Sequence, residues 1–429
     1  MTVADASAVA ADGVAVPAPP AVRFVGDPRA YWRLLARGSA LLAVTLGIYR
    51  FWFATDIRRF LWSNTEAAGE TLEYTGTATE LLIGFLIAIA VLIPLNVALA
   101  LATLSAGPIG ELASTLTFPI LFFLGQFAIY RARRYRLTRT VYRGIRCHQT
   151  GSALRYAVCA VFWWSMIVLT LGLAYPLAQS RLERFKMRNT WYGDLQGRFE
   201  GSSLRLLLRG FPMWLLVVGP LAGAVAFAVA TVDWDKVAAA AASSSGGSEF
   251  INQLEGASPA VYSAIVVALA AVSISIVMTA VLFPVFQAMV LRWWLAGLRF
   301  GELTIHSHLR TSHIYGAYLR FLWYGLLLLV VIAIVGSIGY VVLGLMLVAI
   351  GNADTAEAVN AAAMIGLYVV TMLGFSAIYQ GTVKLSLWRS GVESIVFEGL
   401  DVLDRVKAQG AASSAVGEGL ADALNVGGI

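Results

Sequence analysis

The sequence predicts an all-α polytopic membrane protein with about eight apolar helical segments, internal repeats and short cytosolic motifs in which strands are also expected. The chain of 429 residues is 59% hydrophobic and only 13% charged, whereas soluble chains are about one quarter charged. Several apolar runs are longer than the roughly 18 residues that suffice to cross a membrane. Residues 326–350 are apolar at nearly every position, which favours helices over the alternating strands of a membrane barrel.

A basic polar motif recurs between the apolar segments. Residues 131–152 align without a gap with residues 181–202, and a third copy lies at residues 59–77. In each of these three copies a threonine precedes a glycine by eleven residues. Looser copies follow at residues 292–307 and 384–399. Because internal repetition at this scale reflects repeated structural units, the motif predicts a repeated architecture.

A longer match joins residues 26–76 to residues 151–201 at one constant offset. It pairs Thr-Leu-Gly at 45–47 with Thr-Leu-Gly at 170–172, which indicates a duplication. The candidate structural positions of the repeats are Gly47, Gly172, Asn64, Asn189, Thr65, Thr140 and Thr190.

The expected organisation is a disordered tail at 1–22, a first membrane repeat at 23–148, a second at 149–291, a partial third at 292–399 and a C-terminal tail at 400–429. Beyond a short helix ending near Gln409, we expect this last tail to be disordered because it is rich in Gly, Ala and Ser. The apolar segments lie at about 34–53, 78–101, 108–130, 157–178, 204–229, 260–290, 318–350 and 358–379. Six of them form three hairpins, and the other two each begin a duplicated half. Residues such as 394–398 have strand composition, so short strands that pair between copies are expected in the polar motifs.

The motif set resembles the YjgN-like family of bacterial inner-membrane proteins. The resemblance rests on residues 45–49 (TLGIY) followed by a basic helix end and Asn64-Thr65, on residues 139–146 (RTVYRGIR) and on residues 298–303 (LRFGEL). It covers roughly residues 24–399. The family has no assigned activity, substrate or catalytic residue, so the resemblance implies a membrane location and no site role. Residues 174–176 (AYP) depart from residues 49–51 (YRF) of the first copy.

The arginines are the leading functional candidates. Because clustered basic side chains beside a membrane bind anionic lipids, a lipid or phosphate site is predicted. The competing interpretation is that these charges only hold the loops in the cytoplasm. The candidate contacts are Arg131, Arg133, Arg134, Arg136, Arg139, Arg181 and Arg184.

Other chemistry has weak signals. His306, His308 and His313 lie close together but have no nearby cysteine, so we predict no metal site. Cys147 and Cys159 are expected to be reduced. No phosphate-binding loop, nucleophile elbow or zinc-protease motif is present, and no cofactor or catalytic residue is predicted. No nucleic-acid signature accompanies the net charge of +6, so the expected partners are membrane lipids.

The function predicted from the sequence is a membrane scaffold or an anionic-lipid-interacting protein of the bacterial inner membrane. A transporter or channel is the alternative, and a lipid-modifying enzyme is a third. The polar residues Asn96, Gln126 and Gln287 fall inside apolar runs, but no acidic residue lies mid-span, and a coupled carrier usually needs one.

The topology separates these functions. If the segments at 34–53 and 157–178 both cross, the two halves are inverted, as in many transporters. If all basic motifs are cytoplasmic, neither segment crosses: both enter and return, with breaks near Gly47 and near residues 172–176, or lie partly in the interface. We expect this same-side arrangement.

Overall fold

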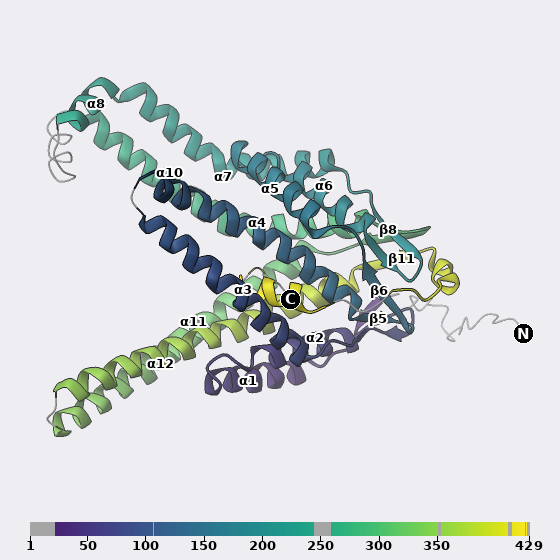
Figure 1. The fold of residues 1–429 in the computed structure, drawn as a ribbon. Coiled ribbons are helices and arrows are strands. Elements are labelled where there is room, and N and C mark those ends of the chain that lie inside the picture. The colour runs from purple at the N-terminus through teal and green to yellow at the C-terminus, as the bar shows by residue number, and fades with distance from the viewer. Residues whose placement is uncertain are drawn as a thin grey trace, which may run out of the picture.

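The protein consists of three long helical hairpins that extend from a body of shorter helices and strands (Figure 1). The computed structural model describes residues 22–105, 107–243, 259–350, 353–410, 414–424 and 426. The predicted tail at 1–22 therefore lies outside the described residues except for Val22. The hairpin helices are α3 (Ala78–Leu104) with α4 (Pro108–Thr138), α7 (Ser203–Thr231) with α10 (Pro259–Gly297), and α11 (Thr311–Ile350) with α12 (Ala353–Tyr379). A short helix, α8 (Trp234–Ser243), follows α7.

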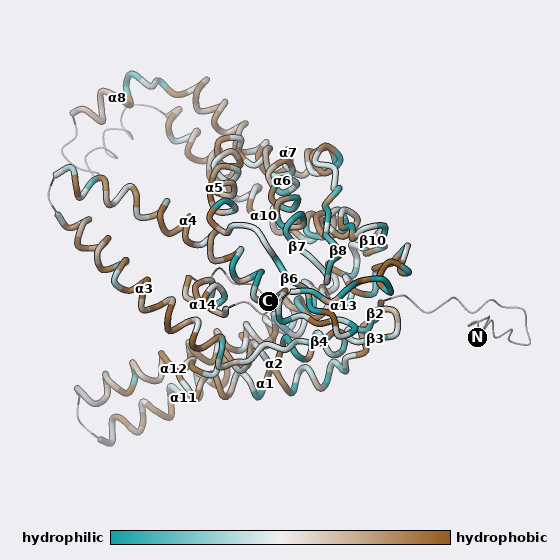
Figure 2. Tube along the Cα trace, turned by 45° about the vertical axis from the view of Figure 1, so that its right-hand side comes forward, coloured by the Kyte–Doolittle hydropathy of each residue, from teal (hydrophilic) through white to brown (hydrophobic). Residues whose placement is uncertain are grey.

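Six helices in the described part of the chain are long and apolar enough to cross a membrane. They are the six hairpin helices, the last of which continues as one candidate span over Ala356–Glu393. Their large apolar side chains are mostly exposed, as expected of surfaces that face lipid rather than water. Figure 2 shows these hairpins as mainly hydrophobic tubes. The chain is thus a multi-pass membrane protein, and the predicted eight apolar segments provide six spans rather than eight.

The two remaining apolar segments are broken. The first forms α1 (Pro28–Val44) and α2 (Arg50–Ser63), and the second forms α5 (Ala153–Leu169) and α6 (Tyr175–Arg188). The two helices of each pair contact each other, so the chain turns back at both positions. The predicted breaks near Gly47 and Gly172 are confirmed.

Each break is made by the Thr-Leu-Gly sequence. The hydroxyl of Thr170 donates to the carbonyl of Met166 (2.7 Å) and accepts from the N–H of Ala174 (3.0 Å), so one side chain caps both helices. Gly172 has φ = +95°, a conformation that strongly favours glycine. The first break has the same bonds at Thr45, with 2.7 Å to Leu41 and 3.0 Å from Tyr49, and Gly47 has φ = +93°.

The polar motifs form an eight-stranded antiparallel sheet in the order β11-β10-β9-β8-β7-β6-β5-β4. The expected short strands that pair between successive motifs are confirmed: β4 pairs with β5, β6 with β7, β8 with β9 and β10 with β11. The sheet is more extensive than the short strands that the sequence predicts. Its strands are β4 (Glu73–Tyr74), β5 (Thr140–Tyr142), β6 (Ile145–Gln149), β7 (Thr190–Tyr192), β8 (Leu195–Phe199), β9 (Leu298–Phe300), β10 (Leu303–Ser307) and β11 (Ile395–Glu398).

A smaller sheet of β1 (Val22–Phe24), β2 (Thr65–Ala67) and β3 (Glu70–Thr71) lies beside the first motif. The buried core lies where the helices meet the strands. One cluster contains Tyr31, Leu35 and Ile57, and another contains Tyr130, Tyr156 and Leu182. The body is therefore held by aromatic and aliphatic packing, while the hairpins extend away from it.

The described part of the C-terminal tail contains a helix at Val416–Ala423, which corrects the expectation of disorder beyond Gln409. After α12 come a π-helical turn, η1 (Gln380–Lys384), then α13 (Leu385–Glu393), β11, a 3₁₀ turn η2 (Leu400–Arg405) and α14 (Val416–Ala423). Helix α14 packs between α3 and α4. Glycines make this possible, since a Cβ on Gly419 would lie 1.9 Å from the backbone of Gly84.

Candidate functional site

The repeated threonines have one structural role. Thr65, Thr140 and Thr190 each donate a side-chain hydrogen bond to the carbonyl four residues earlier, at 2.7, 2.9 and 2.8 Å. Asn64 and Asn189 likewise donate to the carbonyls of Phe60 and Phe185, both at 2.7 Å. These residues thus end the motif helix and start the strand, because their side chains take the carbonyls that the ending helix leaves free.

The eleven-residue spacing from threonine to glycine is explained by a second repeated contact. In each motif, an arginine of the helix contacts the backbone carbonyl of the glycine that ends the motif. Arg59 donates to Gly76 (3.0 Å), Arg134 donates to Gly151, and Arg184 approaches Gly201 (3.5 Å). These arginines close each motif before the next helix begins.

Most arginines of the second motif are also engaged within the protein. Arg139 pairs with Glu80 (2.7 Å), and Arg133 donates to the hydroxyl of Thr190 (3.1 Å). Arg131 lies against α14, where a Cβ on Gly417 would meet its Cβ at 2.2 Å. Arg136 is half-buried. The five predicted contacts at Arg131, Arg133, Arg134, Arg136 and Arg139 therefore do not gather at one open surface.

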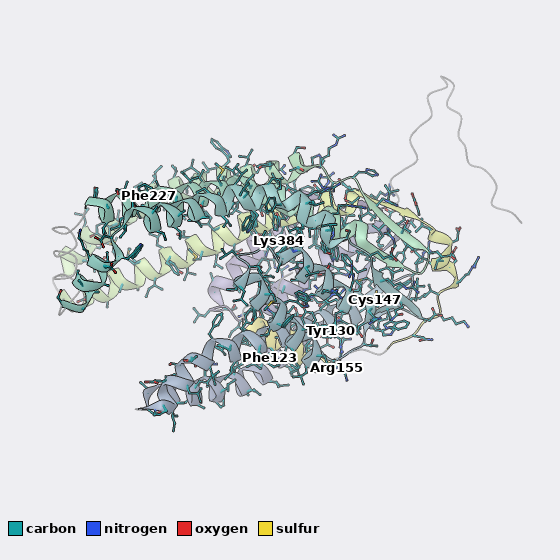
Figure 3. The ribbon with its side chains drawn as sticks, turned by 90° about the horizontal axis from the view of Figure 1, so that it is seen from above. Phe123, Tyr130, Cys147, Arg155, Phe227 and Lys384 are labelled. Carbon is teal, nitrogen blue, oxygen red and sulfur yellow. The ribbon has the colours of Figure 1, made fainter. Side chains whose placement is uncertain are left out.

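The third motif is different, because its arginines line an open cavity of about 710 Å³. Arg181, Arg184 and Arg188 come from α6, and they share one face because they are spaced three and four residues apart. Arg155 comes from the first turn of α5 and Arg198 from β8. Figure 3 labels Arg155 at the edge of the body.

Local structure fixes where the outlying arginines lie. Ser152 caps α5 by accepting from the N–H of Arg155 (3.4 Å), which sets this arginine one turn inside the helix. Along β8 the burial alternates, so Arg198 is exposed between the buried residues Gly197 and Phe199. Gly197 allows the strand to approach α6 closely, since a Cβ there would lie 2.8 Å from Cε of Met187.

The cavity is strongly cationic. None of the described residues that line it is acidic. All five arginines are exposed, and within the described chain no hydrogen bond or ion pair engages the guanidinium groups of Arg155, Arg181, Arg188 and Arg198. Guanidinium groups form paired hydrogen bonds with carboxylate and phosphate oxygens. This arrangement can therefore bind an anion with several oxygens.

Of these five arginines, the sequence motif pointed to Arg181 and Arg184, and it did not point to Arg155, Arg188 and Arg198. Arg188 and Arg198 lie inside the third motif, where Arg188 continues the α6 face, and Arg155 follows Gly151, the glycine that ends the second motif. The sequence does not show that the register of β8 and the first turn of α5 bring Arg198 and Arg155 next to α6.

Other titratable groups show little sign of chemistry. Burial raises the pKa of the Cys147 thiol to about 11, so the nucleophilic thiolate is scarce at neutral pH. Burial lowers the pKa of His148 and that of Lys186. His306 lies 3.5 Å from Glu398. Within the described ranges, no three His, Cys, Asp or Glu side chains are placed to hold a metal ion.

Comparisons with known proteins identify the family of this chain and give no information on its activity. Neither a curated protein nor a solved structure matches the chain. Residues 19–423 match the family described as "Bacterial protein of unknown function (DUF898)". This is the YjgN-like family that the sequence motifs resemble. Because the match covers nearly the whole sequence, the chain belongs to this bacterial family of unknown function.

Proposed function

We propose that this protein is an inner-membrane scaffold that binds anionic lipid headgroups through the arginine cavity, defined by Arg155, Arg181, Arg184, Arg188 and Arg198. One observation carries the proposal: five arginines from three elements surround one cavity that has no acidic lining residue in the described structure. Like charges repel, so such a cluster is unfavourable without an anion to offset it.

The location of the cavity supports a lipid ligand. It lies at the base of the α5–α6 hairpin, whose Thr-Leu-Gly turn exposes apolar residues such as Leu169 and Leu171 at 73% and 69%. The hairpin would insert these residues among lipid chains, which leaves the arginines at the level of the phosphates. Basic side chains near an anionic leaflet contribute about 1 kcal/mol each.

The sheet supports a platform on one side of the membrane. All the polar motifs lie at the same end of the molecule in Figure 1, and strands of successive motifs are hydrogen-bonded to one another. By the positive-inside rule this end is cytoplasmic. The likeness of the two broken hairpins is also what a duplication would produce. Inverted halves, which the transporter alternative would use, fit this geometry less well.

The test compares two pairs of exposed arginines in the purified full-length protein. Arg155→Gln with Arg181→Gln removes two charges from the cavity. Arg205→Gln with Arg209→Gln removes two charges from exposed positions on α7, which do not line the cavity. Binding of phosphatidylglycerol and phosphatidylcholine to delipidated protein is measured by native mass spectrometry.

We expect the cavity variant to weaken phosphatidylglycerol binding by about 10-fold or more, because each removed arginine contributes about 1 kcal/mol to the binding free energy. The α7 variant should have a smaller effect, and phosphatidylcholine binding should not change in either. Equal losses in the two variants would show that the arginines act as general surface charge and would refute a built site.

A further inference from the structure

A second cavity, of about 520 Å³, lies among the helices and shares no lining residue with the arginine cavity. Its walls come from α6, α10, α12, η1 and α13, with Leu61 from α2, and are mostly aromatic or aliphatic. Three of its lining residues carry amide or amine groups: Gln287, Gln380 and Lys384. We call it the Lys384 cavity. Figure 3 labels Lys384 near the middle of the molecule.

Lys384 lies just beyond α12, in the continuation of the candidate span Ala356–Glu393 and at the start of the last polar motif, residues 384–399. Lys384 ends the π-helical turn at Gln380–Lys384, and such turns are frequent at functional sites because they widen the helix locally. The same turn therefore supplies two of the three polar groups of the cavity.

These polar groups are not fully used within the protein. The Oε1 atom of Gln380 is buried and accepts no hydrogen bond, but as an acceptor it offers nothing to an anion, so recognition of an anionic head rests on Lys384. In the part of the chain that is described, no hydrogen bond or ion pair holds the Lys384 ammonium. The charges of Arg136 and Arg58 act on Lys384, and no acidic residue is among the described lining. An unpaired charge in such surroundings is unfavourable, so a bound anion would stabilise it.

An apolar groove of about 480 Å³ continues from this cavity. The two share Tyr175, Phe283 and Phe286. The groove runs between the α5–α6 turn and helices α7 and α10. Of the described residues that line it, none is charged. Its lining includes Phe211, which is 45% exposed on the surface of a candidate span. The groove thus has the composition that suits an alkyl chain.

From this geometry we propose that the Lys384 cavity and its groove bind a single-chain amphiphile with an anionic head. The carboxylate or phosphate lies at Lys384, and the alkyl chain occupies the groove. This site is separate from the headgroup site proposed above, and neither depends on the other.

The test uses full-length, delipidated protein in a neutral detergent with oleate, oleoyl lysophosphatidate and oleyl alcohol as probes. Lys384→Gln should weaken the binding of oleate by about 10-fold or more, because hydrogen bonds to charged groups contribute about 1.5–3 kcal/mol. Lys384→Arg should retain most of the affinity. Oleyl alcohol should bind the three proteins equally. Tighter binding of the lysophosphatidate than of oleate would identify the head as phosphate, and the reverse order would identify it as carboxylate.

A second variant tests the groove without touching the charge. Gly210 lines it, and a Cβ there would meet only Cε of Met289, at 3.5 Å. Gly210→Leu should weaken binding of oleate more than binding of the shorter laurate, and thermal unfolding should verify that each variant is folded. Unchanged oleate affinity in Lys384→Gln would overturn the proposal. The Arg155→Gln, Arg181→Gln variant should bind oleate normally, and an equal loss there would place the ligand in the arginine cavity instead.

Discussion

Single residues determine where the apolar segments break. Thr170 satisfies a carbonyl of α5 and an N–H of α6, and the indole of Trp214 donates to the carbonyl of Leu171 (2.7 Å). Backbone groups at membrane depth need such partners, because lipid chains offer none. The break is therefore tolerated where α7 and the threonine supply the missing bonds.

At this scale we expect Gly47→Ala and Gly172→Ala each to destabilise the protein by about 1–2 kcal/mol, since an L-residue at strongly positive φ is strained. A Cβ at Gly47 meets nothing within 4 Å, so the effect there comes from the backbone alone. Thermal unfolding in detergent measures the change.

Gly223→Ala on α7 is the matched control, because a Cβ added there also meets nothing within 4 Å and Gly223 does not have a positive φ. This change should leave the melting temperature unchanged or raise it through better helix propensity. If the Gly47 and Gly172 variants behave like this control, the turns do not require glycine.

The sequence could predict these breaks because charge and topology were in conflict: three spans in each half would have placed two basic motifs on opposite sides. It could not predict that Arg134 and Arg139 would bind Gly151 and Glu80. Those contacts depend on how motif and helix fold together. The number of arginines in a motif does not show whether they pair within the protein or line an open cavity.

Among the elements, α14 has the least obvious sequence signal, because it is short and rich in Gly and Ala. Its position is set by charge. Glu418 pairs with Arg58, and both side chains are 6% exposed. Burial alone would lower the pKa of Arg58, but the charge of Glu418 and the hydroxyl of Tyr74 raise it overall. The C-terminal helix thus neutralises an arginine of α2 that would otherwise be buried alone.

Glu418→Gln should therefore destabilise the protein by about 3 kcal/mol, since breaking a buried ion pair leaves an uncompensated charge. Asp422→Asn removes the partner of Arg50, a pair whose side chains are 39% and 34% exposed. That variant should lower the free energy of unfolding by less than about 1 kcal/mol. Equilibrium unfolding in mixed micelles compares the two, and equal effects would contradict the account of α14.

For the whole molecule, the sequence predicted about eight apolar helical segments, six of them in three hairpins, and the described structure has six candidate spans. The same-side placement of the motifs stays a prediction. The sequence did not predict the order of the strands in the eight-stranded sheet. Each strand has only two to five residues, and pairing between strands so short is set by the helices that carry them. The arginine cavity was partly missed for the same reason, because β8, α5 and α6 bring its residues together.

The central claim is that all basic motifs form one platform on the cytoplasmic side. Single cysteines at the exposed positions Ser63, Thr150, Asp194 and Glu302 report on four successive motifs, and Ser105 reports on the turn between α3 and α4. The background lacks Cys147 and Cys159, and intact cells are treated with an impermeant thiol reagent. We predict that the four motif cysteines are protected and that the cysteine at 105 is labelled. Labelling of some motif cysteines and protection of others would show that the motifs lie on opposite sides and would contradict the platform.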